Sequence, residues 1–304
     1  MPHTSRPALS GLLLAAAGAI AFSGKAIIVK LSYTYGVDAV TVIMYRMLFA
    51  LPFFIAMGLW AERQAIAREN PLTRRDVIDI VGLGFVGYYL SSYLDFLGLQ
   101  YITASLERLI LYLNPTLVVL LGWAIYKKPI HPIRMLAMAI SYSGVMLVFS
   151  HELSFAGADV ALGSSLVFGS AVSYAVYLIY SGQLVQRIGS LRLVGWATSV
   201  ACVCCIAQFV VLRPLSAAVV PVEVLWLGVL NAVACTVAPV LMVMMAIERI
   251  GAGLAAQTGM VGPMSTILMG VVLLGEPFTG WVAAGTALVV AGIFVFSSSP
   301  YRHG

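Results

Sequence analysis

Charged residues are scarce in this chain. Asp, Glu, Lys and Arg make up only 10% of its 304 residues, whereas soluble domains carry about a quarter. Hydrophobic residues reach 61% and the mean hydropathy is +1.00. The apolar segments run to about 20 residues, the length that spans a bilayer as a helix. They lack the alternation of an outer-membrane barrel. The composition therefore excludes an ordinary soluble protein and predicts an all-α integral membrane protein.

Sequence patterns for catalysis are also missing. The histidines lie at the termini or in expected loops, and none has a second ligand at metal spacing. The four cysteines lie in apolar segments and are read as small buried hydrophobes. Neither a Gly-x-Ser-x-Gly elbow nor a Walker phosphate loop occurs. We therefore expect no enzyme activity, no cofactor and no metal. The absence of a basic face with interleaved aromatics predicts no nucleic-acid partner.

Ten apolar segments predict ten transmembrane helices. The first segment is long and lacks a small-residue cleavage site, so we expect it to remain as a span and not to be removed as a signal peptide. The expected spans are 9–32, 39–60, 77–99, 103–126, 131–150, 161–186, 191–212, 222–246, 252–274 and 278–298.

The basic residues predict the orientation of these spans. Of the 17 Lys and Arg residues, twelve fall on the side that holds both termini, and only Lys30 and Arg213 fall on the other side. Short loops rich in Lys and Arg stay in the cytoplasm. Both termini are therefore expected to be cytoplasmic, in a multi-pass protein of the inner (plasma) membrane.

The second half of the chain repeats the first at an offset of 148 positions. Pro115 then aligns with Pro263, and Gly144 with Gly292. Matches of Gly and Pro carry weight because these residues constrain the backbone. Five spans in each half is an odd number, so the second half is expected to be inverted in the membrane. We expect two five-helix repeats, 1–152 and 153–304.

The fourth and ninth spans carry a proline at matching positions of the two halves. Asn114-Pro115 interrupts the fourth span, and Gly262-Pro263 lies at the same place in the ninth. Proline removes one backbone donor and frees a carbonyl of the preceding turn. In a membrane such groups are satisfied only by protein or by a water-filled cavity. Broken helices in matching positions of two halves point to the central site of a transporter.

These features resemble the drug/metabolite transporter superfamily, and specifically the EamA family of ten-span metabolite exporters. The most telling stretch runs from Met260 to Phe296, where Leu273-Leu274-Gly275-Glu276-Pro277 precedes a last helix with spaced glycines. The first half departs from this pattern, with Lys127-Lys128 where Gly-Glu is usual. Such a resemblance implies export of small metabolites, including amino acids as in exporters of the YddG type. Glu276 is itself read as a helix cap or turn brace.

Five ionisable residues lie inside the first four spans, within roughly 10 Å of the outer face at 1.5 Å per residue. Charges there are expected to pair inside the bundle, because lipid exposure costs at least about 2.5 kcal/mol each. If each acid takes one base, one cation remains to attract a substrate carboxylate or to contribute to gating or coupling. The alternative is a fixed ion-pair network that braces the helices. The five residues are Lys25, Arg46, Asp95, Glu107 and Arg108.

Polar side chains also recur at helical spacing in the third and sixth spans. Such stripes suit a pocket for a partly apolar small molecule. The alternative is packing between helices, with local hydroxyl and amide bonds. Tyr88, Ser91 and Asp95 share one face of the third span. The expected substrate-binding residues are Tyr89, Ser92, Tyr93, Asn114, Tyr174, Tyr177, Asn231 and Gln257.

The expected function is a secondary transporter that exports small amphiphilic metabolites, with amino acids as the first candidates, by alternating access around a central cavity. Its partners would be that substrate and the lipid bilayer. The sequence does not predict an oligomeric state. Two other classes stay open at this point. They are a flippase of lipids or lipid-linked sugars from the same superfamily, and a non-transporting membrane scaffold.

Overall fold

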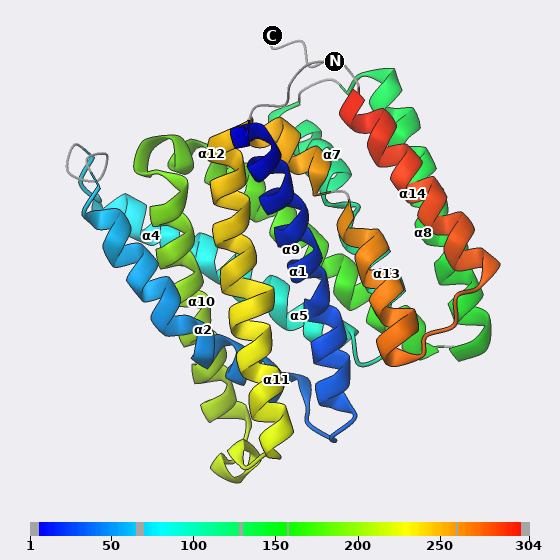
Figure 1. The fold of residues 1–304 in the computed structure, drawn as a ribbon, viewed down its shortest axis with the longest axis horizontal. Helices are drawn as coiled ribbons and strands as arrows, with labels where there is room; N and C mark the ends of the chain where they lie inside the picture. The colour runs from blue at the N-terminus through cyan, green and yellow to red at the C-terminus, as the bar shows by residue number, and fades with distance from the viewer. Residues whose placement is uncertain (1–5, 65–69, 128–129, 157, 260, 299–304) are drawn as a thin grey trace.

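The computed structural model describes residues 6–64, 70–127, 130–156, 158–259 and 261–298, and within these ranges the regular structure is entirely helical. Figure 1 shows the helices as one bundle. Their bounds are α1 (Arg6–Tyr33), α2 (Ala39–Glu62), α4 (Arg74–Leu83), η1 (Gly84–Leu90), α5 (Ser91–Gly98), α6 (Ala104–Leu111), α7 (Asn114–Tyr126), α8 (Pro132–Ala156), α9 (Ala158–Ile188), α10 (Ser190–Leu212), η2 (Leu215–Ala218), α11 (Val222–Ala232), η3 (Val233–Val237), α12 (Ala238–Thr258), α13 (Val261–Leu274) and α14 (Gly280–Ser298).

Eight helical segments in the described part of the chain are long and apolar enough to cross a membrane. They coincide with the first eight expected spans. Two shorter apolar helices, Met264–Leu274 and Gly280–Phe296, lie where the ninth and tenth spans were expected. The structure thus has the all-helical, membrane-type architecture that hydropathy predicts, while the count of ten spans stays a prediction.

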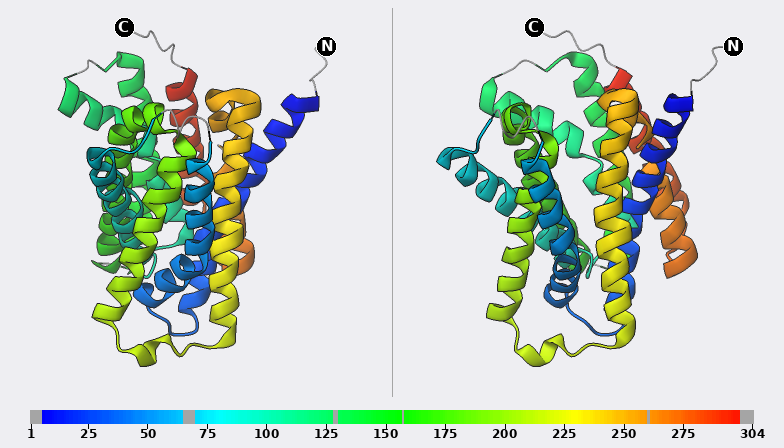
Figure 2. Two further views of the ribbon diagram at one scale, coloured as in Figure 1. Left: turned by 90° about the vertical axis from the view of Figure 1, so that its left-hand side faces the viewer. Right: turned by 60° about the vertical axis from the view of Figure 1, so that its left-hand side comes forward.

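Helices of the first half pack mainly against helices of the second half. The closest partners are α8 with α14, α1 with α12, α2 with α10, and α5 with α9. Figures 1 and 2 show α1 and α12 side by side along much of their length. The largest buried apolar cluster lies where α1, α2, α5 and α10 meet. A core built this way holds both halves around a shared interior.

The bundle has two distinguishable ends. The first described turn of α1 and the end of α14 lie at one end, at the top of Figure 1, together with the α9–α10 turn. We call this the terminal end. The opposite end holds the α1–α2 and α10–α11 connections, where Asp38 and Arg213 form an ion pair at 3.2 Å. The distribution of basic residues predicts that the terminal end faces the cytoplasm.

Two segments of π-helix interrupt the third and eighth spans. They are η1 (Gly84–Leu90) and η3 (Val233–Val237). At the offset of 148 positions they occupy almost equivalent positions in the sequences of the two halves. A π turn takes up an extra residue, changes the face presented by the following helix and often occurs at functional sites. The sequence pattern showed a proline, Pro239, near only one of them.

The chain reaches the proline-containing helices α7 and α13 differently in the two halves. In the first half α6 ends at Leu111, and α7 begins at Asn114. In the second half α12 continues to Thr258 and α13 begins at Val261, so the connection expected near 247–251 is helical. Glu248 and Arg249 did not end the helix there, because a charged turn can stay helical where the helix extends beyond the apolar layer.

Candidate substrate cavity

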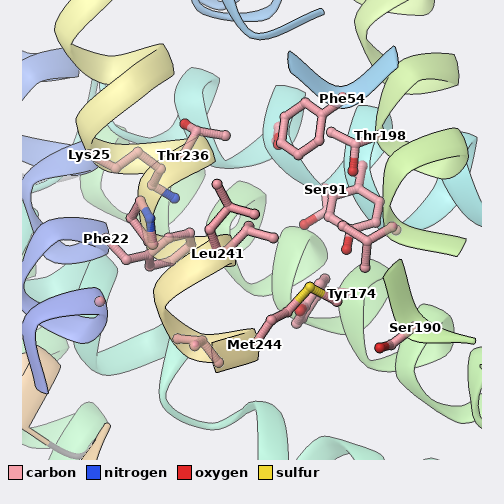
Figure 3. A pocket seen from close by; sticks show the side chains of 18 of the residues that line it. Phe22, Lys25, Phe54, Ser91, Tyr174, Ser190, Thr198, Thr236, Leu241 and Met244 are labelled. Carbon is pink, nitrogen blue, oxygen red and sulfur yellow. The ribbon is translucent and has the colours of Figure 1, made fainter. Parts of the chain in front are cut away.

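A cavity of about 1020 Å³ lies between the two halves. On α2 its lining reaches from Arg46 to Ala61, about 22 Å at 1.5 Å per residue. At the terminal end it is bordered by Gln64 and by Ser190 to Arg192. Figure 3 shows Lys25 and Thr236 at one side of the cavity, and Ser91, Tyr174 and Ser190 at the other. The cavity therefore extends from the buried charged residues toward the terminal end.

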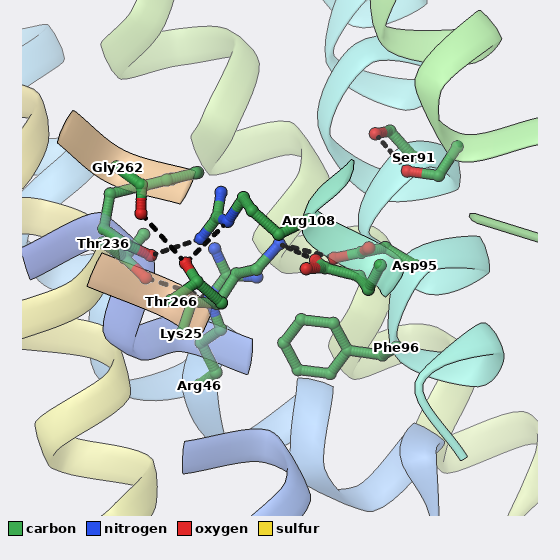
Figure 4. A network of polar contacts seen from close by, with 12 residues as sticks. Lys25, Arg46, Ser91, Asp95, Phe96, Arg108, Thr236, Gly262 and Thr266 are labelled. Atoms are coloured by element: carbon green, nitrogen blue, oxygen red, sulfur yellow. Dashed lines mark hydrogen bonds and ion pairs between the residues drawn. The ribbon is translucent and has the colours of Figure 1, made fainter. Parts of the chain in front are cut away.

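Lys25 on α1 joins two carboxylates. Its Nζ lies 2.5 Å from Oδ2 of Asp95 on α5 and 3.6 Å from Oε1 of Glu107 on α6. Glu107 is fully buried, and neither of its oxygens accepts a hydrogen bond from the described residues. Oδ1 of Asp95 also lacks a hydrogen-bond partner there. One ammonium group therefore neutralises part of a buried pair of acids, as drawn in Figure 4.

Arg46 and Arg108 are each held by a threonine of the second half. Nε of Arg46 donates to Oγ1 of Thr236 at 2.9 Å, and Nε of Arg108 donates to Oγ1 of Thr266 at 2.9 Å (Figure 4). The guanidinium carbon of Arg46 lies 5.2 Å from the ring centroid of Phe96. Neither arginine forms an ion pair with an acid of the described residues.

The pairing therefore differs from the expected one base for each acid. Lys25 pairs with both Asp95 and Glu107, so that two cations, Arg46 and Arg108, remain without an acid of the described residues instead of the one that was expected. The reason is geometric: α1 approaches α5 and α6 closely enough for one ammonium to reach both carboxylates, while both arginines point toward the second half. Lys25 is buried, with only 7% of its side chain exposed, so it does not snorkel to an interface.

Hydroxyl and apolar groups line the rest of the cavity. Oγ of Ser91 on α5 lies 3.0 Å from Oγ of Ser170 on α9, which ties these helices together. Beside them the rings of Tyr88 and Tyr174 meet edge to face with centroids 6.4 Å apart. Leu241 and other residues of α12 form an apolar wall. Such a lining suits a solute with an apolar body and a few polar groups.

The structure brings some of the predicted binding residues to the cavity and places others elsewhere. Ser92, Asn114, Tyr174 and the helix-break residue Pro115 line it. Oδ1 of Asn114 has no hydrogen-bond partner among the described residues. The side chains of Gln257 and Pro263 lie outside the described residues. Residues that do not line the cavity are Tyr89, Tyr93, Tyr177 and Asn231.

The third span meets the cavity with the face that carries Tyr88, while Tyr89 and Tyr93 lie on another face. Tyr89 and Tyr93 stack on each other with ring planes at 6° and pack against the apolar cluster of α1, α2, α5 and α10. Tyr88, one position earlier, lines the cavity and also lies 3.3 Å, hydroxyl to hydroxyl, from Tyr177. Ser91 and Asp95 line the cavity together with Tyr88, so the face that regular helical spacing groups in the third span is the one that meets the cavity, although η1 lies within that span.

Glu276 caps the start of α6 at the opposite end of the bundle. Its carboxylate accepts hydrogen bonds from the backbone N–H groups of Ala104 and Ser105, at 2.7 and 3.2 Å, and from Oγ of Ser105 at 2.8 Å. An anion at a helix N-terminus satisfies otherwise unpaired donors and interacts well with the helix dipole. The α13–α14 turn of the second half is thereby bonded to the first half.

Replacing Glu276 by Ala is expected to lower the stability of the folded protein by about 1–2 kcal/mol, because the helix loses its carboxylate cap. Thermal unfolding in detergent measures this. Glu223→Ala is the matched control, because Glu223 is exposed at the start of α11. Equal unfolding temperatures for the two variants would show that the cap contributes nothing.

The comparisons with known proteins agree on a transporter. The profile of the EamA-like transporter family matches residues 9–150 and again 161–298. The chain is 28% identical over 283 residues to YcbK of Bacillus subtilis (strain 168), named an uncharacterized transporter, with 89% of this chain and 87% of that protein covered. A second transporter of that organism, YetK, also named uncharacterized, is 23% identical over 237 residues, covering 74% of this chain and 69% of its own length.

A protein of known crystal structure shares the fold. It aligns with a TM-score of 0.60 at 18% sequence identity and covers 95% of this chain and 97% of its own. At this identity the likeness concerns the fold alone. Because the family profile covers most of the sequence, the chain belongs to the EamA-like transporter family, within the drug/metabolite transporter superfamily.

Proposed function

We propose that this membrane transporter is a secondary carrier that exports small amphiphilic metabolites, with amino acids as the first class to test. The observation that carries the proposal is the cavity between the two halves, which reaches from Lys25 and Asp95 to the terminal end. Its lining of hydroxyls, aromatic rings and buried charges suits small molecules with an apolar body and a polar head group.

The two EamA-like segments would act as inverted repeats, 1–152 and 153–304, that rock about the cavity in the plasma membrane. With the terminal end in the cytoplasm, the cavity would be the inward-facing one. The N-terminal ends of α7 and α13, near Pro115 and Pro263, and the π segments η1 and η3 are the points where backbone hydrogen bonding is already irregular. Small rotations there would open the opposite end and close the terminal end.

Counterflow in proteoliposomes tests this function. Vesicles loaded with unlabelled amino acids are placed in a trace of labelled phenylalanine, and the uptake of label is followed. We expect uptake that depends on the internal amino acid and survives collapse of the pH gradient. Failure of every amino acid to drive exchange would overturn amino acids as the substrate class. Scrambling of labelled lipids in the same vesicles would instead favour a flippase.

A further inference from the structure

The buried charges at the end of the cavity that lies away from the terminal end do not balance. Lys25 contacts the two acids Asp95 and Glu107, and these three ionised groups together carry one negative charge. Arg46 and Arg108 add two positive charges and form no ion pair with the described residues. The layer therefore has an excess of one positive charge. Protonation of either acid would only increase this excess.

The two arginines are also placed to contact a ligand, and Nη2 of Arg108 donates one hydrogen bond to the carbonyl oxygen of Phe22 at 3.4 Å. Both line the cavity, and they are only 5% and 4% exposed. The bonds to Thr236 and Thr266 engage Nε of each side chain and so fix the plane of each guanidinium. Nη1 of Arg46 has no hydrogen-bond partner among the described residues. A buried guanidinium with an unsatisfied donor is costly unless an anion completes it.

From this geometry we propose that the cavity selects carboxylates with a net charge of −1. The carboxylate would bind Arg46 and Arg108, and the apolar body of the solute would lie against Phe22, Leu241 and Met244 (Figure 3). Guanidinium groups match the planar geometry of carboxylates and bind them through paired hydrogen bonds. Organic acids and deaminated or N-acylated amino acids belong to this class. The inference rests on the proposed function and ranks its candidate substrates.

A zwitterionic amino acid fits the same site less well. Its ammonium group lies two bonds from its carboxylate carbon, so it would enter a layer that already has an excess positive charge. The unpartnered Oδ1 of Asp95 could accept it, but Lys25 Nζ already lies 2.5 Å from the other oxygen of that carboxylate. Two ammonium groups on one carboxylate repel each other, which reduces the gain.

Three ligands with the same phenyl body separate these cases. 3-Phenylpropionate carries a carboxylate, phenethylamine carries an ammonium group, and phenylalanine carries both. Binding to the purified protein is measured by thermal shift, and transport by counterflow in proteoliposomes. We expect 3-phenylpropionate to bind most tightly, phenylalanine about tenfold more weakly, and phenethylamine weakest of all. Tighter binding of phenylalanine or phenethylamine, or equal binding of all three, would overturn the inference.

Variants of the arginines test the assigned contacts. Arg46→Gln and Arg108→Gln are each expected to weaken binding of 3-phenylpropionate about tenfold or more and not to weaken binding of phenethylamine, because the change removes a positive charge. Arg46→Lys should restore part of the carboxylate preference. Arg213→Gln is the control, because Arg213 lies at the opposite end, outside the cavity lining. An equal loss for all three ligands in Arg46→Gln would overturn the contact.

The two proposals fail in different ways. Binding of 3-phenylpropionate that depends on Arg46, without counterflow of any solute, would overturn the carrier function and leave the carboxylate site standing. Robust counterflow of phenylalanine with no preference for the acid would do the reverse. Each result thus contradicts one proposal and supports the other.

Discussion

Lys25→Met is expected to cause the largest loss of stability of any single substitution in the charge layer. The change removes the ammonium that lies 2.5 Å from Asp95 and 3.6 Å from Glu107 and leaves two buried acids without it. Removing one partner of a buried ion pair costs about 3–5 kcal/mol, because the remaining charge is uncompensated. The readout is the midpoint of thermal unfolding in detergent, followed by size-exclusion chromatography of the folded fraction.

The decisive control is Lys25→Met in a protein that lacks the two acidic side chains. In the Asp95→Asn, Glu107→Gln double variant, Lys25→Met should cost much less, because no buried negative charge is left behind. Arg213→Gln gives the scale for an exposed pair. Arg213 and Asp38 are 39% and 34% exposed in their side chains, and such pairs contribute about 0–1 kcal/mol. A cost of Lys25→Met that is equal in both backgrounds would mean that packing, not charge, explains it.

Gly285→Ala is expected to separate α8 from α14. An added Cβ at Gly285 would lie 2.6 Å from the carbonyl oxygen of Gly144, and one at Gly144 would lie 2.6 Å from the carbonyl oxygen of Gly285. The two backbones thus contact each other directly, as small residues allow in membrane helix pairs. The side chain of Val148 would also clash, and because the carbonyl of Gly144 is backbone and cannot rotate away, overpacking is expected to cost about 3 kcal/mol.

Gly182→Ala is the matched control for this prediction. It makes the same chemical change in the interior of α9, where an added Cβ would meet no atom within 4 Å. Since Ala is the better helix former, that variant should unfold at the same temperature as the unchanged protein or somewhat above it. A fall in the unfolding midpoint for Gly285→Ala that is no larger than for Gly182→Ala would contradict the close approach of α8 and α14.

Hydropathy placed most of the helices correctly because it is a property of local sequence. A run such as 39–60 must be helical in a membrane, since every backbone donor and acceptor needs a partner inside the segment. Prolines likewise act on their own turn, and α7 begins at Asn114, immediately before Pro115. The residues of the charge layer could be found in the same way, because an ionisable side chain in an apolar run stands out.

Helix packing decided which of those residues meet. That Lys25 joins both acids, and that both arginines reach threonines of the second half, depends on the rotation of each helix about its axis. Rotation follows from contacts between residues that are far apart in the sequence, such as those between α1 and α12. The sequence could therefore predict which charged residues share one layer, but not which of these side chains contact each other.

The sequence by itself determined that this protein is a helical membrane protein, where most of its helices lie and that the fourth span is broken next to Pro115. Only the tertiary structure decided which side chains line the cavity. Tyr88 lines the cavity, whereas Tyr89 and Tyr93, which were expected to bind substrate, pack against the apolar cluster. The physical reason is that burial in lipid constrains each segment separately, whereas the face that a helix presents is set jointly by all of its neighbours.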